Sequence, residues 1–275
     1  MRQVRRWLLS VAAVATMGAS ALAQGGVATA GTAAAARGSA GAGAADQART
    51  AAAGARVILS AWQPVKKILK PGMRGAAVEK VQRRLRALHY YPGKIDGEFG
   101  QNTLEAVWAF KEVQGLSTSK NPNNIGHTME HTLADPRAPK PLTRHHANNR
   151  IDVSLRGGYL VLYRHGNVRL ISHISSGGGY YFCDPPPNQG ICGYAITPTG
   201  NYHALSFVPG QVKVPLGAMY NPVFFIGREF AIHGDGYVPL QPVSHGCVRI
   251  PNHIASFFHT LFTIPGTKIF IRRHR

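Results

Sequence analysis

The hydrophobic positions between residues 69 and 136 recur at helical spacing. Val78, Val81, Leu85 and Leu88 lie three or four residues apart, and most of the positions between them are charged or polar. This period places the apolar side chains on one face of a helix and the charged side chains on the other faces. The stretch therefore predicts an amphipathic helix that packs against a small core.

Two more helices are predicted in the same stretch. The second covers residues 103–113, with Asn102 as its N-cap, Glu105 three residues after the cap and Gly115 just beyond its end. The third is short and covers residues 128–133. Together the three helices are expected to form a compact helical unit.

From residue 151 onward the pattern becomes strand-like. Short runs rich in β-branched and aromatic residues alternate with turns that contain glycine. Strands are expected over residues 151–155, 159–163, 168–174, 202–208, 222–225, 230–232 and 268–272, and one helix over 252–262. The pattern predicts an α+β multidomain chain, in which a three-helix domain is followed by a β-rich, sandwich-like domain with a helix packed on it.

The N-terminus has the features of a secretory signal peptide. Three arginines precede a largely apolar run, and Ala21-Leu22-Ala23 gives the small-x-small pattern that signal peptidase reads. Cleavage is therefore expected before Gln24, so that the mature protein lies outside the cytosol. The alternative is a retained membrane anchor, for which the run is barely long enough.

These patterns divide the chain into segments. Residues 24–60 are mostly Ala and Gly, with too little bulky apolar surface to offset the entropy of ordering, and are interpreted as a flexible linker. A Pro-rich, basic stretch is interpreted as a second linker. The expected organisation is a signal peptide (1–23), a linker (24–60), a helical domain (61–136), a linker (137–149) and a β-rich domain (150–275).

The chain is strongly basic. It has 31 Lys and Arg against 12 Asp and Glu, for a formal net charge of +19. Such a charge attracts polyanions without specifying which one, and for an exported chain the anionic polymers of a cell wall are the expected partners. Aromatic and basic residues do not interleave in a pattern that would stack on bases, so nucleic acid is not predicted. No specific protein partner is predicted.

The chain has three cysteines, and outside the cytosol two of them are expected to pair. Cys183 and Cys192 bracket a Pro-rich loop, and their spacing suits a local disulfide. Whether they are bonded depends on a geometry that only a structure provides. Cys247 would then keep a free thiol.

Cys247 lies in the densest cluster of reactive residues. His245 and Gly246 precede it directly, and His233-Gly234 lies upstream. A thiol attacks as thiolate, and a nearby imidazole is the usual means of removing its proton. Gly246 permits a sharp turn that aims consecutive N–H groups at one oxygen, as in an oxyanion hole. An isolated cysteine is more often a small buried hydrophobe, but the neighbouring histidines in an exported chain favour a nucleophile.

Residues 69–116 carry an ordered series of motifs. Leu-Lys-Pro-Gly-Met-Arg-Gly at 69–75 is followed by the apolar helix positions and then by Ile-Asp-Gly-Glu-Phe-Gly at 95–100. In this order the motifs resemble the peptidoglycan-binding module found on many wall hydrolases. One departure is Lys111, where that family often has Gln. The resemblance implies peptidoglycan as a partner and assigns no individual ligand contacts.

A second series of motifs ends in the cluster around Cys247. Tyr-Leu-Val-Leu-Tyr at 159–163 and Thr-Pro-Thr-Gly at 197–200 precede Ile-His-Gly at 232–234 and Ser-His-Gly-Cys-Val-Arg at 244–249. This order is similar to that of the L,D-transpeptidase catalytic domain, which implies an acyl-transfer enzyme that needs neither metal nor cofactor. The segment 235–243 between the last two motifs is short for that family.

The resemblance also implies roles for the residues of the cluster. Cys247 would be the acylated nucleophile, and His233 would be the base, oriented by the carbonyl of Gly234. The implied oxyanion hole consists of the backbone amides of His245, Gly246 and Cys247, and the implied substrate contacts are Ser244 and Arg249.

The expected function is cross-linking of the cell wall. Cys247 would attack the carbonyl of the third residue of a tetrapeptide stem, release D-Ala and hold a thioester, which an amine of a second stem resolves. Water attacking the same thioester would make the protein an L,D-carboxypeptidase.

The sequence disfavours three further classes of protein. A zinc peptidase would use His233, Asp235, His245 and Cys247 as ligands, but zinc sites favour other spacings, and catalytic ones need a general-base carboxylate. A wall-binding protein without activity is disfavoured because both reactive residues are present. A papain-like peptidase is disfavoured because there the cysteine precedes the histidine in the chain.

Overall fold

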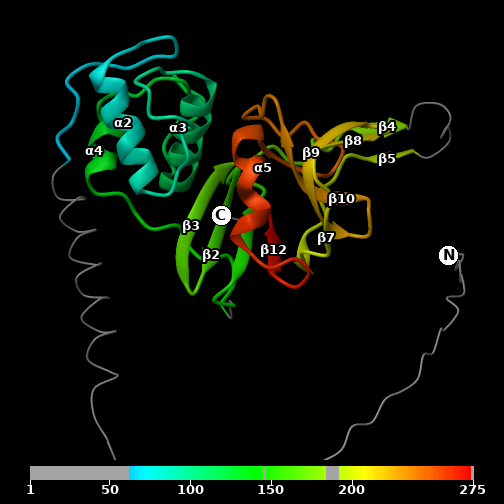
Figure 1. The fold of residues 1–275 in the computed structure, drawn as a ribbon. Helices are drawn as coiled ribbons and strands as arrows, with labels where there is room; N and C mark the ends of the chain where they lie inside the picture. The colour runs from blue at the N-terminus through cyan, green and yellow to red at the C-terminus, as the bar shows by residue number, and fades with distance from the viewer. Residues whose placement is uncertain (1–61, 145–146, 184–191, 274–275) are drawn as a thin grey trace, which may run out of the picture. The chain divides into compact units, whose positions relative to one another are not determined.

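The computed structural model describes residues 62–144, 147–183 and 192–273 (Figure 1). The segments expected to form the signal peptide and the first linker lie outside these residues, as does the Pro-rich loop 184–191. No helix in the part of the chain that the structure describes is long and apolar enough to span a bilayer. All described residues belong to one compact unit of the chain.

The N-terminal part is helical, as predicted. Its helices are α2 (Ala76–Ala87), α3 (Gln101–Gln114) and α4 (His127–Ala134) (Figure 1). The predicted N-cap of α3 was wrong: the helix is capped by Gly100, whose carbonyl accepts the N–H of Leu104 at 3.0 Å, and Asn102 lies in the first turn. Gly115 ends the helix with a left-handed φ of 68°, as its position predicted.

The C-terminal part is β-rich, which confirms the predicted fold class. Its strands are β1 (Arg150–Ser154), β2 (Tyr159–Arg164), β3 (Asn167–His173), β4 (Tyr181–Cys183), β5 (Cys192–Tyr194), β6 (Gly200–His203), β7 (Ser206–Phe207), β8 (Gln211–Val214), β9 (Gly217–Ile226), β10 (Phe230–Asp235), β11 (Val248–Pro251) and β12 (Lys268–Arg272). One sheet has the order β3-β2-β1-β12-β6, and a second has the order β11-β10-β9-β7 with β8 paired to β9. β4 and β5 form a separate hairpin.

The two larger sheets enclose a common apolar core. It contains Ile151 and Leu162 from the first sheet and Val223 and Ile232 from the second, together with residues of helix α5 (Asn252–Phe258). A short 3-10 helix, η1 (His259–Leu261), follows α5, so the single helix predicted over 252–262 is divided.

One predicted strand is divided between the two sheets. Residues 202–208 were expected to form a single strand, but β6 belongs to the first sheet and β7 to the second. The chain changes sheets at Ala204, whose N–H donates to Thr267 and whose carbonyl accepts from Gly266. Ala204 is fully buried, so the crossing is part of the core.

Strand β2 is buried on both faces. Leu160 and Leu162 point into the core between the sheets, whereas Tyr159, Val161 and Tyr163 belong to the core of the helical part. Side chains alternate along a strand, so one strand serves two cores. Helix α3 packs on β2 and β3, and the helical and β-rich parts therefore share an apolar interface.

Because the two parts share this core, we predict that they unfold together. Phe110→Ala should lower the free energy of unfolding by about 3–5 kcal/mol, since Phe110 is fully buried in the helical core. Urea titration followed by circular dichroism and tryptophan fluorescence measures this. Ile68→Ala, at an exposed position, is the control and should change the value by less than about 0.5 kcal/mol. Separate transitions for the helical and β-rich parts would contradict the prediction.

Candidate active site

Adjacent strands bring the reactive residues together. β10 and β11 are parallel, and their register places His233 opposite Arg249. Cys247 directly precedes β11. His233, Cys247 and Arg249 all line one cavity of about 730 Å³. The sequence cluster is therefore also a spatial cluster.

His233 is held in one tautomer. The residue is 4% exposed, and its Nδ1 lies 2.9 Å from the carbonyl oxygen of Gly234. A carbonyl can only accept a hydrogen bond, so Nδ1 carries the proton. Burial lowers the pKa of His233 and thereby favours the neutral ring. Nε2 then keeps its lone pair, as a general base requires.

Cys247 is a partly buried free thiol. Burial raises its pKa, and a hydrogen bond from the backbone of Ala231 and the charge of Arg249 offset part of that rise. Its Sγ lies 3.7 Å from the carbonyl oxygen of Glu229, and within the described residues it has no hydrogen bond to the His233 ring. The resting pair is thus a neutral thiol and a neutral imidazole in one cavity.

The turn before Cys247 is fixed by small polar side chains. The Ser244 hydroxyl donates to the carbonyl of Cys247 at 2.6 Å and accepts the N–H of Gly246 at 3.0 Å. The Thr197 hydroxyl donates to the carbonyl of Gly246 at 2.7 Å. Gly246 has φ of 146°, and a Cβ there would lie 2.6 Å from the Phe230 ring. Only glycine fits this turn without strain.

These bonds give several of the expected site residues a place in the turn. Ser244 lines the cavity and its hydroxyl is engaged inside the turn, and its contact with substrate stays a prediction. The N–H of Gly246, implied as an oxyanion donor, already has an acceptor, whereas the N–H of Cys247 has none among the described residues. Thr197 was not expected to support the turn. The Thr-Pro-Thr-Gly motif was visible in the sequence, but nothing local linked it to Gly246.

Arg249 faces the same cavity. Its Nη1 lies 3.3 Å from the Asp235 carboxylate, and its Nε is buried without a hydrogen-bond partner among the described residues. A buried donor without a partner is costly, so an acceptor supplied from the cavity would be favoured here.

The β4–β5 hairpin borders the cavity. A disulfide of 2.01 Å joins Cys183 and Cys192. The rings of Phe182 and Tyr180 lie edge-on to His245, with centroids 4.7 and 5.5 Å away. His245 is thereby packed by the segment that begins the hairpin, a contact that motif spacing does not reveal.

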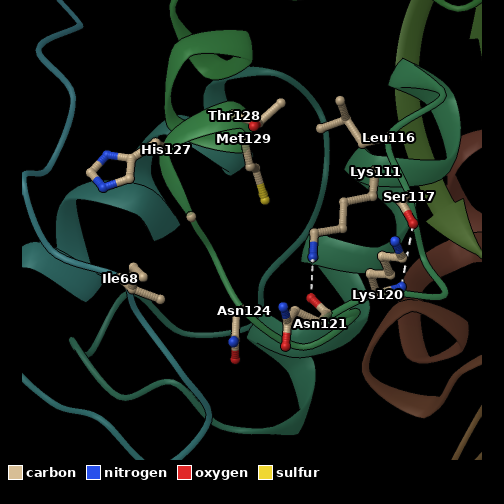
Figure 2. Close-up of a pocket in the computed structure, with 11 residues that line it drawn as sticks. Ile68, Lys111, Leu116, Ser117, Lys120, Asn121, Asn124, His127, Thr128 and Met129 are labelled. Atoms are coloured by element: carbon tan, nitrogen blue, oxygen red, sulfur yellow. Dashed lines mark hydrogen bonds between the residues drawn. The ribbon is translucent and has the colours of Figure 1, made fainter.

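A second, smaller cavity lies in the helical part (Figure 2). Its volume is about 280 Å³, and Lys111 from α3 points toward it. The ammonium donates to the carbonyls of Asn121 and Pro122 at 3.0 and 2.6 Å, and burial lowers the pKa of Lys111 to about 8. Lys120 and His127 also line this cavity, and none of its described lining residues carries a carboxylate. Such a cavity suits an anionic group.

Comparison with known proteins assigns both parts. Residues 74–124 match the family model of a peptidoglycan binding domain, and residues 148–271 match that of the L,D-transpeptidase catalytic domain. A crystal structure of an L,D-transpeptidase from Xylanimonas cellulosilytica has a TM-score of 0.68 and 28% identity, and the match covers 76% of this chain and 100% of that chain.

Two curated relatives match over shorter stretches. A probable N-acetylmuramoyl-L-alanine amidase of Bacillus licheniformis is 38% identical over 72 residues, which are 24% of this chain and 20% of the relative. N-acetylmuramoyl-L-alanine amidase CwlA of Bacillus subtilis is 39% identical over 57 residues, which are 18% of this chain and 21% of the relative. The matched stretches span about a fifth of the length of these relatives.

The fold and the site define a two-part protein, with a peptidoglycan-binding domain ahead of a β-rich catalytic domain. Residues 148–271 match the L,D-transpeptidase catalytic domain family and residues 74–124 match the peptidoglycan binding domain family, which confirms both resemblances.

Because burial raises the pKa of Cys247, we predict that its alkylation by iodoacetamide increases with pH through a midpoint above that of an ordinary thiol. Mass spectrometry of the intact protein across a pH series measures the rate. Cys247→Ser should take up no label, because the other two cysteines are bonded to each other. A midpoint below the ordinary value would reveal a resting thiolate and contradict the neutral pair.

Proposed function

We propose that this protein is a cysteine L,D-transpeptidase that cross-links peptidoglycan. The N-terminal segment (1–23) would export it, and the helical domain would retain it at the wall. The main support is the His233–Gly234 hydrogen bond, which leaves Nε2 of a buried, neutral imidazole available in the cavity that also holds the Cys247 thiol.

The reaction begins with attack by Cys247. Its Sγ forms a bond to the carbonyl carbon of the third stem residue, and its proton passes to Nε2 of His233. The amide bond to D-Ala then breaks, and His233 returns the proton to the leaving amine. Because neither partner is charged at rest, the proton moves during the attack rather than before it.

The cavity also supports the charges that develop. The N–H of Cys247 has no acceptor among the described residues, so it is the amide best suited to the tetrahedral oxyanion. Arg249 offers its buried Nε to a substrate carboxylate or carbonyl. The amine of a second stem then attacks the thioester carbonyl and gives a proton to His233. The C–S bond breaks, and His233 returns that proton to the Cys247 thiolate.

The zinc alternative gains no support from the geometry. Within the described ranges, no three His, Cys, Asp or Glu side chains lie close enough together to hold a metal ion. Treatment with EDTA is therefore expected to leave activity unchanged.

Incubation with a disaccharide-tetrapeptide tests the proposed reaction. The wild type should release D-Ala and form a dimer, whereas Cys247→Ala should lose at least about a thousandfold in rate because the nucleophile is gone. Mass spectrometry identifies the products. A tripeptide without dimer would indicate the carboxypeptidase alternative, and no reaction would refute the proposal. A carbapenem adduct on the wild type and none on Cys247→Ala would locate the acylated residue.

We propose further that the Lys111 cavity takes an anionic group of the wall, such as a stem-peptide carboxylate. Lys111→Met should weaken retention on purified sacculi by about tenfold or more, since a charge-assisted hydrogen bond would be lost. Co-sedimentation measures the affinity. Lys94→Met is the matched control, because it removes an equal charge at an exposed position outside the cavity. Equal loss in both variants would show that only net charge matters.

A further inference from the structure

The segment between the Ile-His-Gly motif and the Ser-His-Gly-Cys motif is held in position by residues outside the segment itself. Residues 236–243 connect the end of β10, which carries His233, to the turn at Ser244, and they form no helix or strand. Val238 in this segment is nevertheless fully buried. A loop without regular structure takes its position from the groups that bond to it.

Helix α3 of the peptidoglycan-binding domain carries a stripe of polar and aromatic residues. Gln101, Glu105, Trp108 and Glu112, here called the α3 stripe, follow one another at intervals of four, three and four residues and so share one helix face. The last three are buried, although they include two carboxylates. Buried carboxylates require partners, and each of these two has one in the catalytic domain.

The first half of the stripe bonds directly to the loop. Gln101 Nε2 donates to the carbonyl of Gly236 at 2.7 Å. The N–H of Val238 donates to Glu105 Oε1 at 3.3 Å, and Gln101 also donates to that oxygen at 3.1 Å. The Trp108 ring lies edge-on to Tyr237, with centroids 6.5 Å apart.

Glu112, the last residue of the stripe, is linked to the loop through His173, which lies at the end of β3. His173 Nδ1 lies 2.9 Å from both oxygens of Glu112, and Nε2 lies 3.1 Å from the carbonyl oxygen of Pro239. The carbonyl can only accept, and a carboxylate accepts as well, so both ring nitrogens carry protons. The His173 and Glu112 side chains are 0% and 7% exposed, which makes this a buried ion pair.

The surroundings of His173 favour this charged state. Burial alone would lower its pKa, but the Glu112 carboxylate, the hydrogen bond to Pro239 and the more distant Glu105 together raise it. On the neighbouring strand β2, the residue that pairs with His173 is Tyr159. Burial raises the pKa of Glu105, and Asp235 contributes to that rise while His173 opposes it.

The loop in turn adjoins the reactive groups. Its first residue follows Asp235, whose carboxylate pairs with Arg249. Near its other end, Ser175 donates to the carbonyl of Gln241 and accepts the N–H of Val243, the residue before the Ser244 turn. A displaced loop would therefore move both the Arg249 pair and the turn that presents Cys247.

We propose that the α3 stripe, together with His173, positions the 236–243 loop, so that the peptidoglycan-binding domain is a working part of the catalytic unit and not only a wall anchor. The stripe residues are positioning residues, because they act through the loop and do not line the catalytic cavity. The inference relies on the proposed function only for the choice of acylation as its readout.

Two variants of the full chain test the proposal by the rate of Cys247 acylation by a carbapenem. Gln101→Ala removes one tether at an exposed position and should slow acylation about fivefold. His173→Phe with Glu112→Met replaces the ion pair by apolar groups of similar size and should slow it about a hundredfold, since a displacement of about 1 Å can cost that much. Alkylation by iodoacetamide should be slowed less than acylation, because it needs the thiol but not the oriented amide and Arg249 that would hold a substrate.

Gln114→Ala, on the same helix but bonded to Arg137 instead of the loop, is the matched control and should acylate like the wild type. Sacculus binding should be unchanged in all variants. The proposal is overturned if Gln101→Ala acylates as fast as Gln114→Ala, or if the losses only follow the fraction of unfolded protein. Because Gln101 is exposed, its variant decides the matter even where the double variant fails to fold.

Nitrogen-15 NMR of the histidines tests the link through His173 without any substrate. Both ring nitrogens of His173 should be protonated at neutral pH, and a neutral ring would overturn this link. A wild type that neither takes up carbapenem nor processes tetrapeptide would refute the proposed function. A wild type that acylates while every stripe variant acylates equally fast would refute only the positioning.

Discussion

The two-sided burial of β2 is the constraint on which the rest of the molecule depends. Leu160 and Leu162 join the two sheets, and Tyr159, Val161 and Tyr163 join the first sheet to the helical core. Because apolar burial drives association in both directions, the helical domain is packed against the catalytic domain rather than carried on a free tether. That packing brings α3 against β3 and places Glu112 beside His173.

The cavity around Cys247 contains both the residues proposed to react and residues that shape the backbone. Cys247 and His233 are the proposed reactive pair, and burial favours the neutral form of each. Ser244 and Thr197 hold the turn through hydrogen bonds to its backbone, so part of the Ser-His-Gly-Cys signature is architectural. A turn fixed in this way holds its amides in place in advance, which is the property that the proposed oxyanion hole requires.

Much of the fold could be predicted from the sequence, and the failures have physical causes. Helices α2, α3 and α4 were found because their apolar period is a local property. The cap of α3 was misplaced because Asn102 is a good cap by type, yet Gly100 supplies the first helical carbonyl. Strands β4, β5, β8 and β11 were missed, since each has at most four residues and is defined by its partners.

The sequence by itself determined the two domain types and the cysteine, histidine and glycine residues of the site, because these signals lie in short motifs. Only the tertiary structure decided which distant residues pack against each helix or strand face. The spacing of Gln101, Glu105, Trp108 and Glu112 places them on one side of a helix. Their partners, however, lie far along the chain, at His173 and in the 236–243 loop. Periodicity shows which side chains point the same way, whereas pairing between distant segments depends on the packing of the whole chain.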